Sequence, residues 1–208
     1  KLLLTGSNSI GILVVPQTTN AFFYNNSVIL TATTSGRGGL TIAGPTTATW
    51  AHKVNQTYTD NIFNTTWAAS TAFAIKFDKN ANVTIQLINN TFNYTMVGFE
   101  NLIAGGVETR YYVDINITYS NGSIAPNVNI TLWNVTGNQF YSFISEADGI
   151  TRINLTDLFI NGISYASIYS NYTITANLST LLARNFSGQM NVSKFPNDTL
   201  FTPMLVFN

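Results

Sequence analysis

YYVDINITYSNGS, residues 111–123, alternates apolar and polar side chains and then reaches a turn signal. The apolar residues fall at the odd positions from Val113 to Ile117, and the polar residues fall at the even positions around them. A period of two indicates a β-strand, because successive side chains of a strand point to opposite faces. The SNGS tetrapeptide at 120–123 is typical of a hairpin turn. The segment therefore predicts a strand with one buried face, followed by a turn.

The same alternation recurs along the chain, in NVTIQLIN at 82–89 and in SIYSNYTITANLS at 167–179. Clusters of Gly, Asn, Asp and Pro separate the apolar runs at the short spacing of a β-sandwich, and no amphipathic helix of three turns is evident. The sequence therefore predicts an all-β fold, an Ig-like or pilin-like β-sandwich. Further strands are expected at 21–34, 40–50, 71–78, 92–99, 139–145, 150–155 and 200–207.

The composition restricts the class of protein. The 208 residues are 45% hydrophobic, which is enough to fill a core, but Lys plus Arg and Asp plus Glu number only 9 each. No basic surface is available for nucleic acid, and no cysteine is available for a disulfide or a thiolate metal site. The chain opens at Lys1 rather than Met, as a chain does after removal of a signal segment. No apolar run is long enough for a stable insertion into a membrane.

Acceptor tripeptides for N-linked glycans are the most frequent motif. The sequence has 27 Asn and 44 Ser plus Thr among 208 residues, so chance supplies 27 × 44/208, or between five and six tripeptides. Sixteen are present, nearly three times that number. Such a chain is expected to be exported and to carry covalent glycans. The acceptors are Asn25, Asn55, Asn64, Asn82, Asn89, Asn93, Asn116, Asn121, Asn129, Asn134, Asn154, Asn171, Asn177, Asn185, Asn191 and Asn197.

Two of these acceptors, Asn129 and Asn134, lie close together in NVNITLWNVTGN at 127–138. The Asn and the hydroxyl residue of a tripeptide share a face of a strand, so Ile130 and Val135 are predicted to enter the core. The outward positions are odd in the first tripeptide and even in the second. A flat strand would bury one acceptor, and we therefore predict a bulge, bend or strand break between Leu132 and Asn134.

The amino-terminal stretch KLLLTGSNSIGILVVPQ, residues 1–17, has two apolar runs separated by a polar break. One interpretation is an ordinary first strand that pairs within its own domain. The other is a donor strand, which completes the sheet of a neighbouring subunit and buries Leu2, Leu4, Ile10, Ile12 and Val14 there. A head-to-tail contact of this kind does not close, so it generates a filament.

The domain organisation follows from this second interpretation. Residues 1–15 are assigned to the donor strand and residues 16–208 to one sandwich domain, with a possible sub-boundary near 105–106, where two glycines adjoin. No low-complexity linker divides the chain, and no repeat of fixed period is evident.

An exported, cysteine-free, charge-poor β chain with many acceptor tripeptides resembles the subunit of the archaeal surface filaments called threads. The resemblance lies in Lys1–Val15 and in the acceptor-bearing strands at 112–136 and 167–193. It implies a pilin-like subunit of an extracellular, glycosylated cell-surface filament that polymerises by donor-strand complementation. Its partners would be identical subunits in a helical homopolymer, and other cells or surfaces in adhesion, aggregation or biofilm formation.

An enzymatic function is not expected. His52 is the only histidine, and no nucleophile elbow is nearby. No catalytic residue, metal site or cofactor is predicted, although carboxylates at 100, 108, 114, 146, 148 and 157 could meet in space as a glycosidase pair. Lys76 is a candidate for an isopeptide bond to an asparagine, with a gatekeeper lysine of an edge strand as the favoured interpretation.

Two other functions remain open. The chain could act as a monomeric surface adhesin or carbohydrate-binding module, with Trp50, Trp67 or Trp133 stacking on sugars. It could also be a surface-layer component, which would share the glycosylation without a donated strand.

Overall fold

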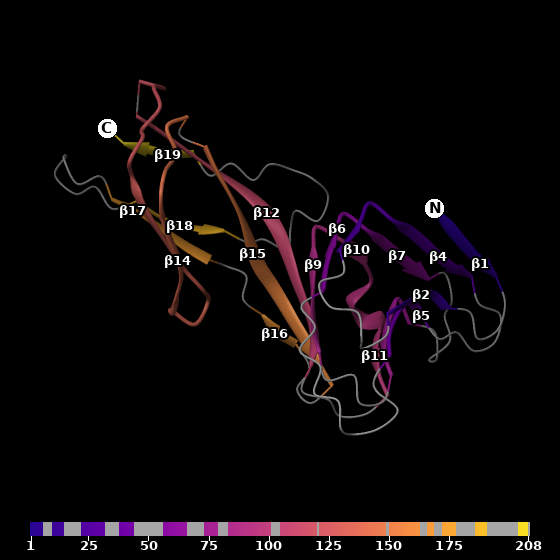
Figure 1. Ribbon diagram of the computed structural model, residues 1–208. Helices are drawn as coiled ribbons and strands as arrows, with labels where there is room; N and C mark the ends of the chain where they lie inside the picture. Colours follow the sequence, from indigo (N-terminus) through magenta and orange to yellow (C-terminus); the bar gives the residue numbers. More distant parts are fainter. Residues whose placement is uncertain are drawn as a thin grey trace. The chain divides into compact units, whose positions relative to one another are not determined.

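In the residues that it describes, the computed structural model is all-β, with strands β1 to β19 and one short 3₁₀ helix, η1 (Figure 1). It divides into two compact units, residues 1–109 with 158–167 and residues 110–157 with 168–208. The structure describes residues 1–5, 10–14, 22–31, 38–43, 56–65, 73–78, 83–100, 105–119, 121–148, 150–162, 166–168, 172–177, 186–190 and 204–207.

The first unit is a stack of coils in which every third strand is a parallel neighbour. The sheet orders are β1-β4-β7-β10, then β2-β5-β8-β11, and then β3-β6-β9, which continues to β12, β15 and β16. In Figure 1, β1, β4 and β7 lie side by side. The bounds are β1 Leu2–Thr5, β2 Ile10–Val14, β3 Phe22–Tyr24, β4 Ser27–Thr31, β5 Gly38–Ile42, β6 Gln56–Thr59, β7 Ile62–Thr65, β8 Ile75–Phe77, β9 Thr84–Ile88, β10 Thr91–Phe92, η1 Tyr94–Met96, β11 Val97–Phe99 and β12 Gly106–Tyr119.

This arrangement differs from the antiparallel sandwich expected for the amino-terminal half. Strands β1, β4, β7 and β10 begin at residues 2, 27, 62 and 91, so the coils differ in length and no fixed period reveals the repeat. Alternation predicts that a segment is a strand, but it does not say which strand pairs with it. The turn signals between the apolar runs were therefore interpreted as hairpins, whereas the paired strands are one full coil apart.

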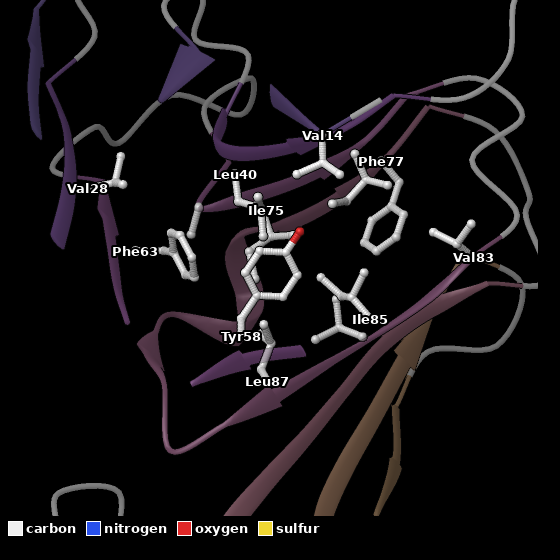
Figure 2. Packing of buried hydrophobic residues seen from close by; sticks show 13 residues of the cluster. Val14, Val28, Leu40, Tyr58, Phe63, Ile75, Phe77, Val83, Ile85 and Leu87 are labelled. Atoms are coloured by element: carbon white, nitrogen blue, oxygen red, sulfur yellow. The ribbon is translucent and has the colours of Figure 1, made fainter. Parts of the chain in front are cut away.

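The core of the first unit is built from stacks of like residues in register on successive coils (Figure 2). Val28 pairs with Phe63, Leu40 with Ile75 and Ile42 with Phe77, and all six are at most 3% exposed. Full burial of such a side chain contributes about 1.5–3 kcal/mol. The aromatic rings stack in the same way, with centroids 4.8 Å apart for Phe23 and Tyr58 and 5.0 Å apart for Phe77 and Phe99.

The second unit contains an antiparallel sheet in the order β14-β13-β17-β18. Its inward residues, among them Ile130, Leu132 and Ile174, join Ile115 of β12 and Leu155 of β15 in one buried cluster. Strand β19 pairs in parallel with the carboxyl-terminal part of β12, Asn116 to Tyr119. The bounds are β13 Asn129–Trp133, β14 Gln139–Ile144, β15 Ile150–Asn161, β16 Ala166–Ile168, β17 Tyr172–Asn177, β18 Phe186–Met190 and β19 Met204–Phe207.

The predicted irregularity near Trp133 is confirmed. The register with β14 shifts between Leu132 and Trp133, and β13 ends at Trp133 before a turn. Ile130 is fully buried as predicted, but Val135 is 52% exposed in the turn, so its predicted burial was wrong. The strand ends before the second tripeptide begins, and the second acceptor therefore needs no place on the strand face.

Candidate assembly edge and glycan acceptors

A ladder of three asparagines joins successive coils of the first unit. Asn26, Asn61 and Asn90 occupy the same turn, immediately before β4, β7 or β10. The backbone N–H of Asn26 donates to Oδ1 of Asn61 over 2.8 Å, and the backbone N–H of Asn61 donates to Oδ1 of Asn90 over 2.8 Å. Asn61 is 1% exposed and Asn90 is 3% exposed. These amides satisfy backbone groups that would otherwise be buried without a partner.

Each ladder amide also bonds backward along the chain. Nδ2 of Asn61 donates to the carbonyl oxygens of Phe23 and Thr59, both over 3.0 Å. Nδ2 of Asn90 donates in the same way to Tyr58, over 2.6 Å, and to Ile88, over 3.0 Å. One side chain therefore ties its own coil to the coil before it.

The residue before each ladder asparagine has a left-handed backbone, with φ of 54° at Asn25, 55° at Asp60 and 53° at Asn89. Asn and Asp adopt this conformation more readily than other non-glycine residues. The sequences NNSV at 25–28, DNIF at 60–63 and NNTF at 89–92 are thus one recurring turn. Sequence reasoning missed these residues, although the shared Asn/Asp-Asn pair, with an apolar residue two positions after its second Asn, was a usable signal.

The ladder is open at its amino-terminal end. Asn26 is the first asparagine of the ladder, and its Nδ2 donates to the Tyr24 carbonyl oxygen and to Oδ1 of Asn61, which leaves Oδ1 of Asn26 as the terminal acceptor. No hydrogen bond to this oxygen is found among the described residues. Strands β1, β2 and β3 are likewise the last strands of their sheets in the described chain. We call these three strands the first coil.

The residues predicted to be donated lie in the first coil, and they pair within their own chain. Leu2 to Thr5 match Val28 to Thr31 of β4 in parallel register, and Ile10 to Val14 match Gly38 to Ile42 of β5. The solvent exposure of their side chains differs along the segment. Val14 is 3% exposed, whereas Leu2 is 41% exposed, and Ile10 and Ile12 are half-buried. For Leu4 the structure gives the backbone register with Leu30.

Gly11 holds β2 tightly against the next coil. A Cβ at this position would overlap the carbonyl oxygen of Gly39 and a methyl group of Val28. The absence of a side chain therefore permits the close approach of two backbones, and here the approach is within one chain. Strand β2 is consequently in close backbone contact with β5 at this position.

The acceptor asparagines occupy several environments. Asn25, Asn64, Asn93, Asn121, Asn129 and Asn177 are exposed, and Asn89, Asn116, Asn134 and Asn154 are half-buried. Asn55, Asn82, Asn171, Asn185, Asn191 and Asn197 lie outside the described residues, as do His52, Trp50 and Trp67. Trp133 is half-buried and donates its indole N–H to Oγ1 of Thr175 over 3.3 Å.

Several of the described carboxylates are bound by other side chains. Arg152 forms two hydrogen bonds to the buried Asp114, of 2.6 and 2.7 Å. Lys76 lies 3.1 Å from Asp78 and 3.4 Å from Glu100. In the described segments, the polar contacts of Lys76 Nζ are with these two carboxylates and not with an asparagine, and no group of three or more potential metal ligands occurs there. Lys76 lies in the central strand β8 of its sheet rather than at an edge.

No helix in the described part of the chain is long and apolar enough to cross a membrane.

Burial raises the pKa of the Tyr58 phenol, and burial followed by the charge of Asp157 raises the pKa of Tyr111. Above pH 10 these tyrosines ionise in the unfolded chain but stay protonated in the folded one, so stability is fully present below pH 10 and falls as the pH rises above it. The expected slope for Tyr58 is about 1.4 kcal/mol per pH unit. Urea unfolding between pH 8 and 11.5, followed by circular dichroism, measures it. Tyr58→Phe should unfold with a shallower pH dependence, and equal slopes would contradict the assignment.

The comparisons with known proteins find little. Neither the family models nor the curated proteins give a match. Among solved structures, the Bacillus anthracis TIE protein aligns with a TM-score of 0.33 and 12% sequence identity. The alignment covers 53% of this chain and 18% of that chain.

Proposed function

We propose that this chain is a structural subunit of an extracellular, N-glycosylated filament, in which β1 of one subunit pairs with β4 of the next. The composition supports a glycosylated surface protein, because sixteen acceptor tripeptides accompany only eighteen charged residues, nine of each sign. Such a filament would serve adhesion, aggregation or biofilm formation, as in the thread-like filaments that the sequence resembles.

The observation that carries the proposal is the position of β1. It pairs with a single neighbour, β4, and is the last strand of its sheet among the described residues. Leu2 and Leu3 are 41% and 60% exposed, so release of these two side chains removes little apolar surface from the core. Release of β2 would instead expose Val14 and open the tight contact at Gly11. We therefore assign the exchange to Leu2–Thr5, and not to the whole segment 1–15.

Exchange of β1 needs no new interface, because the pairing within one chain and the pairing between two chains use the same contacts. Leu2 would meet Val28 of the neighbour in the same parallel register that the structure has within the chain. If each subunit donates to a different neighbour, the contact is head to tail and the polymer stays open.

An engineered disulfide distinguishes pairing of β1 within one chain from pairing between two chains. The chain has no cysteine of its own that would form a competing disulfide. Leu3 and Ile29 are register partners on β1 and β4, and adjacent strands bring Cα atoms to the roughly 4.4–6.8 Å that a disulfide spans. The double variant Leu3→Cys with Ile29→Cys is oxidised at assembling concentration and run on a non-reducing gel. A ladder of covalent oligomers is expected.

Ile29→Cys with Asn64→Cys is the matched control, since it joins the interior strands β4 and β7. Its disulfide should form within one chain at every concentration. A Leu3–Ile29 pair that also closes only within the chain, together with filaments in electron micrographs, would show that β1 is not the exchanged strand.

A monomeric surface adhesin is the second candidate. It is favoured by exposed aromatic side chains on the first coil, where Phe22 is 78% and Tyr24 is 67% exposed, since such rings stack on sugars. A chain that stays monomeric at all concentrations and binds glycans through these rings would support this function. A planar lattice in electron micrographs would indicate a surface-layer component.

A further inference from the structure

Three acceptor tripeptides share one hydrogen-bond pattern, at Asn93, Asn121 and Asn134; the middle residue is left-handed at Gly122, with a φ of 81°, but not at Tyr94 or Val135. In each, the backbone N–H two residues on donates to Oδ1 of the asparagine, over 3.0, 2.9 and 3.1 Å respectively. The side-chain hydroxyl of that same residue donates to the same oxygen, over 2.8 Å from Thr95, 2.6 Å from Ser123 and 2.7 Å from Thr136. Oδ1 therefore accepts two hydrogen bonds from its own tripeptide, and Oδ1 of Asn134 accepts a third from the backbone N–H of Asn138, over 2.9 Å.

The nitrogen of these amides is available. No hydrogen bond donated by Nδ2 of Asn93, Asn121 or Asn134 is found in the described part of the chain. Two donors at Oδ1 stabilise negative charge on that oxygen, which favours loss of a proton from Nδ2. The turn thus orients the amide and polarises it before any enzyme binds.

The other tripeptides with both polar residues described lack this arrangement among the described contacts. Nδ2 of Asn89 donates to Oδ1 of Asp60 over 2.7 Å, and Oδ1 of Asn154 accepts from Nη1 of Arg110 over 3.0 Å. Oδ1 of Asn129 accepts from the Ser142 hydroxyl on the neighbouring strand, over 3.4 Å. Asn116 lies half-buried within β12, and Asn25 precedes a ladder asparagine.

We infer that Asn93, Asn121 and Asn134 are the acceptors that an oligosaccharyltransferase can modify in the folded chain. This inference rests on the glycosylation proposed above. The co-reactant is an oligosaccharide linked through its anomeric carbon to a lipid phosphate. Nδ2 forms a bond to that carbon, the carbon–oxygen bond breaks, and its electron pair leaves with the phosphate. A base of the enzyme takes one Nδ2 proton, and the glycosylated amide keeps the other.

The test compares folded and unfolded acceptors of the same sequence. Chain made in cells without N-glycosylation is incubated with a purified oligosaccharyltransferase and a lipid-linked oligosaccharide, either folded or as tryptic peptides. Mass spectrometry then measures occupancy at each asparagine. We expect the folded chain to be modified at least tenfold faster at Asn93, Asn121 and Asn134 than at Asn89, Asn129 and Asn154. In peptides the difference should shrink to within about threefold.

Gly122→Val separates geometry from sequence, because the changed tripeptide keeps Asn121 and Ser123 and therefore remains an acceptor. Gly122 has a φ of 81°, which a β-branched residue strongly disfavours, and no atom lies within 4 Å of an added Cβ. The folded variant should lose most occupancy at Asn121 while its peptide is modified as before. Ile130→Val, within the strand tripeptide of Asn129, is the control. It should change neither the occupancy of the folded chain nor that of the peptide.

Three outcomes would overturn the inference: equal occupancy of turn and strand sites in the folded chain, an unmodified folded chain with modified peptides, or no effect of Gly122→Val. Failure of the proposed glycosylation itself is a separate result. It would appear as unmodified asparagines throughout protein isolated from its native cells, whatever the folded chain does in the purified reaction.

Discussion

Replacing Asn61 with leucine is expected to lower the free energy of unfolding by about 3–5 kcal/mol. The substitution keeps the size of the side chain but removes the acceptor of the Asn26 N–H and one hydrogen bond from each of the carbonyl oxygens of Phe23 and Thr59. The Thr59 carbonyl oxygen keeps its bond from the Asn25 N–H, over 3.1 Å. Because Asn61 is 1% exposed, water does not readily replace its amide. Urea unfolding followed by circular dichroism measures the loss.

Asn26→Leu is the matched control in the same ladder. Asn26 is exposed at the end of the stack, and its side chain donates to the carbonyl oxygen of Tyr24 and to Asn61. Its replacement should cost less than about 1 kcal/mol, because water can satisfy the groups it leaves. Equal losses for the two variants would mean that the ladder contributes nothing beyond local turn formation.

Gly11→Ala is expected to destabilise the chain by about 3 kcal/mol, the upper end of the usual cost of overpacking. The added methyl group would overlap the carbonyl oxygen of Gly39, which is backbone and cannot rotate away. Strand β2 must therefore move away from β5, and the burial of Val14 against the core is weakened. The same urea titration measures the effect.

Leu13→Ala is the control, because it also changes a side chain of β2 but adds no atom between β2 and β5. Leu13 is 52% exposed, so its truncation should cost less than about 1 kcal/mol. If Gly11→Ala were as stable as the unchanged chain, the close approach of β2 to β5 would not be a requirement of the fold.

The sequence predicts the strands better than it predicts their partners. The alternation from Val113 to Ile117 and the turn after it are present as expected, with Tyr119 N–H bonded to the Ser123 carbonyl. The outward-facing positions change from odd to even around Trp133, and this change predicts the end of β13. A strand with one buried face keeps its outward residues at every second position, so a break in that order can be read from the sequence. These successes share a short range along the chain.

Parallel coils were missed for the opposite reason. The partner of each strand lies a full coil away, and the coils differ in length, so nothing local separates a coil from a hairpin. Strands β6 and β7 lie in QTYTDNIFNT at 56–65, where polar residues interrupt the apolar run and no strand was expected. The recurring Asn/Asp-Asn turn was the one local clue, and it was concealed because two of its three copies overlap acceptor tripeptides.

The asparagine ladder also has a mechanical consequence. Its hydrogen bonds join one coil to the next, in the same direction as the backbone hydrogen bonds between stacked strands. A pulling force along the stack would load these bonds coil after coil and open the stack from its ends, since each coil holds only its neighbours. A force along the strands would instead load all the bonds of a coil pair together. The first unit should therefore resist shear far better than it resists peeling.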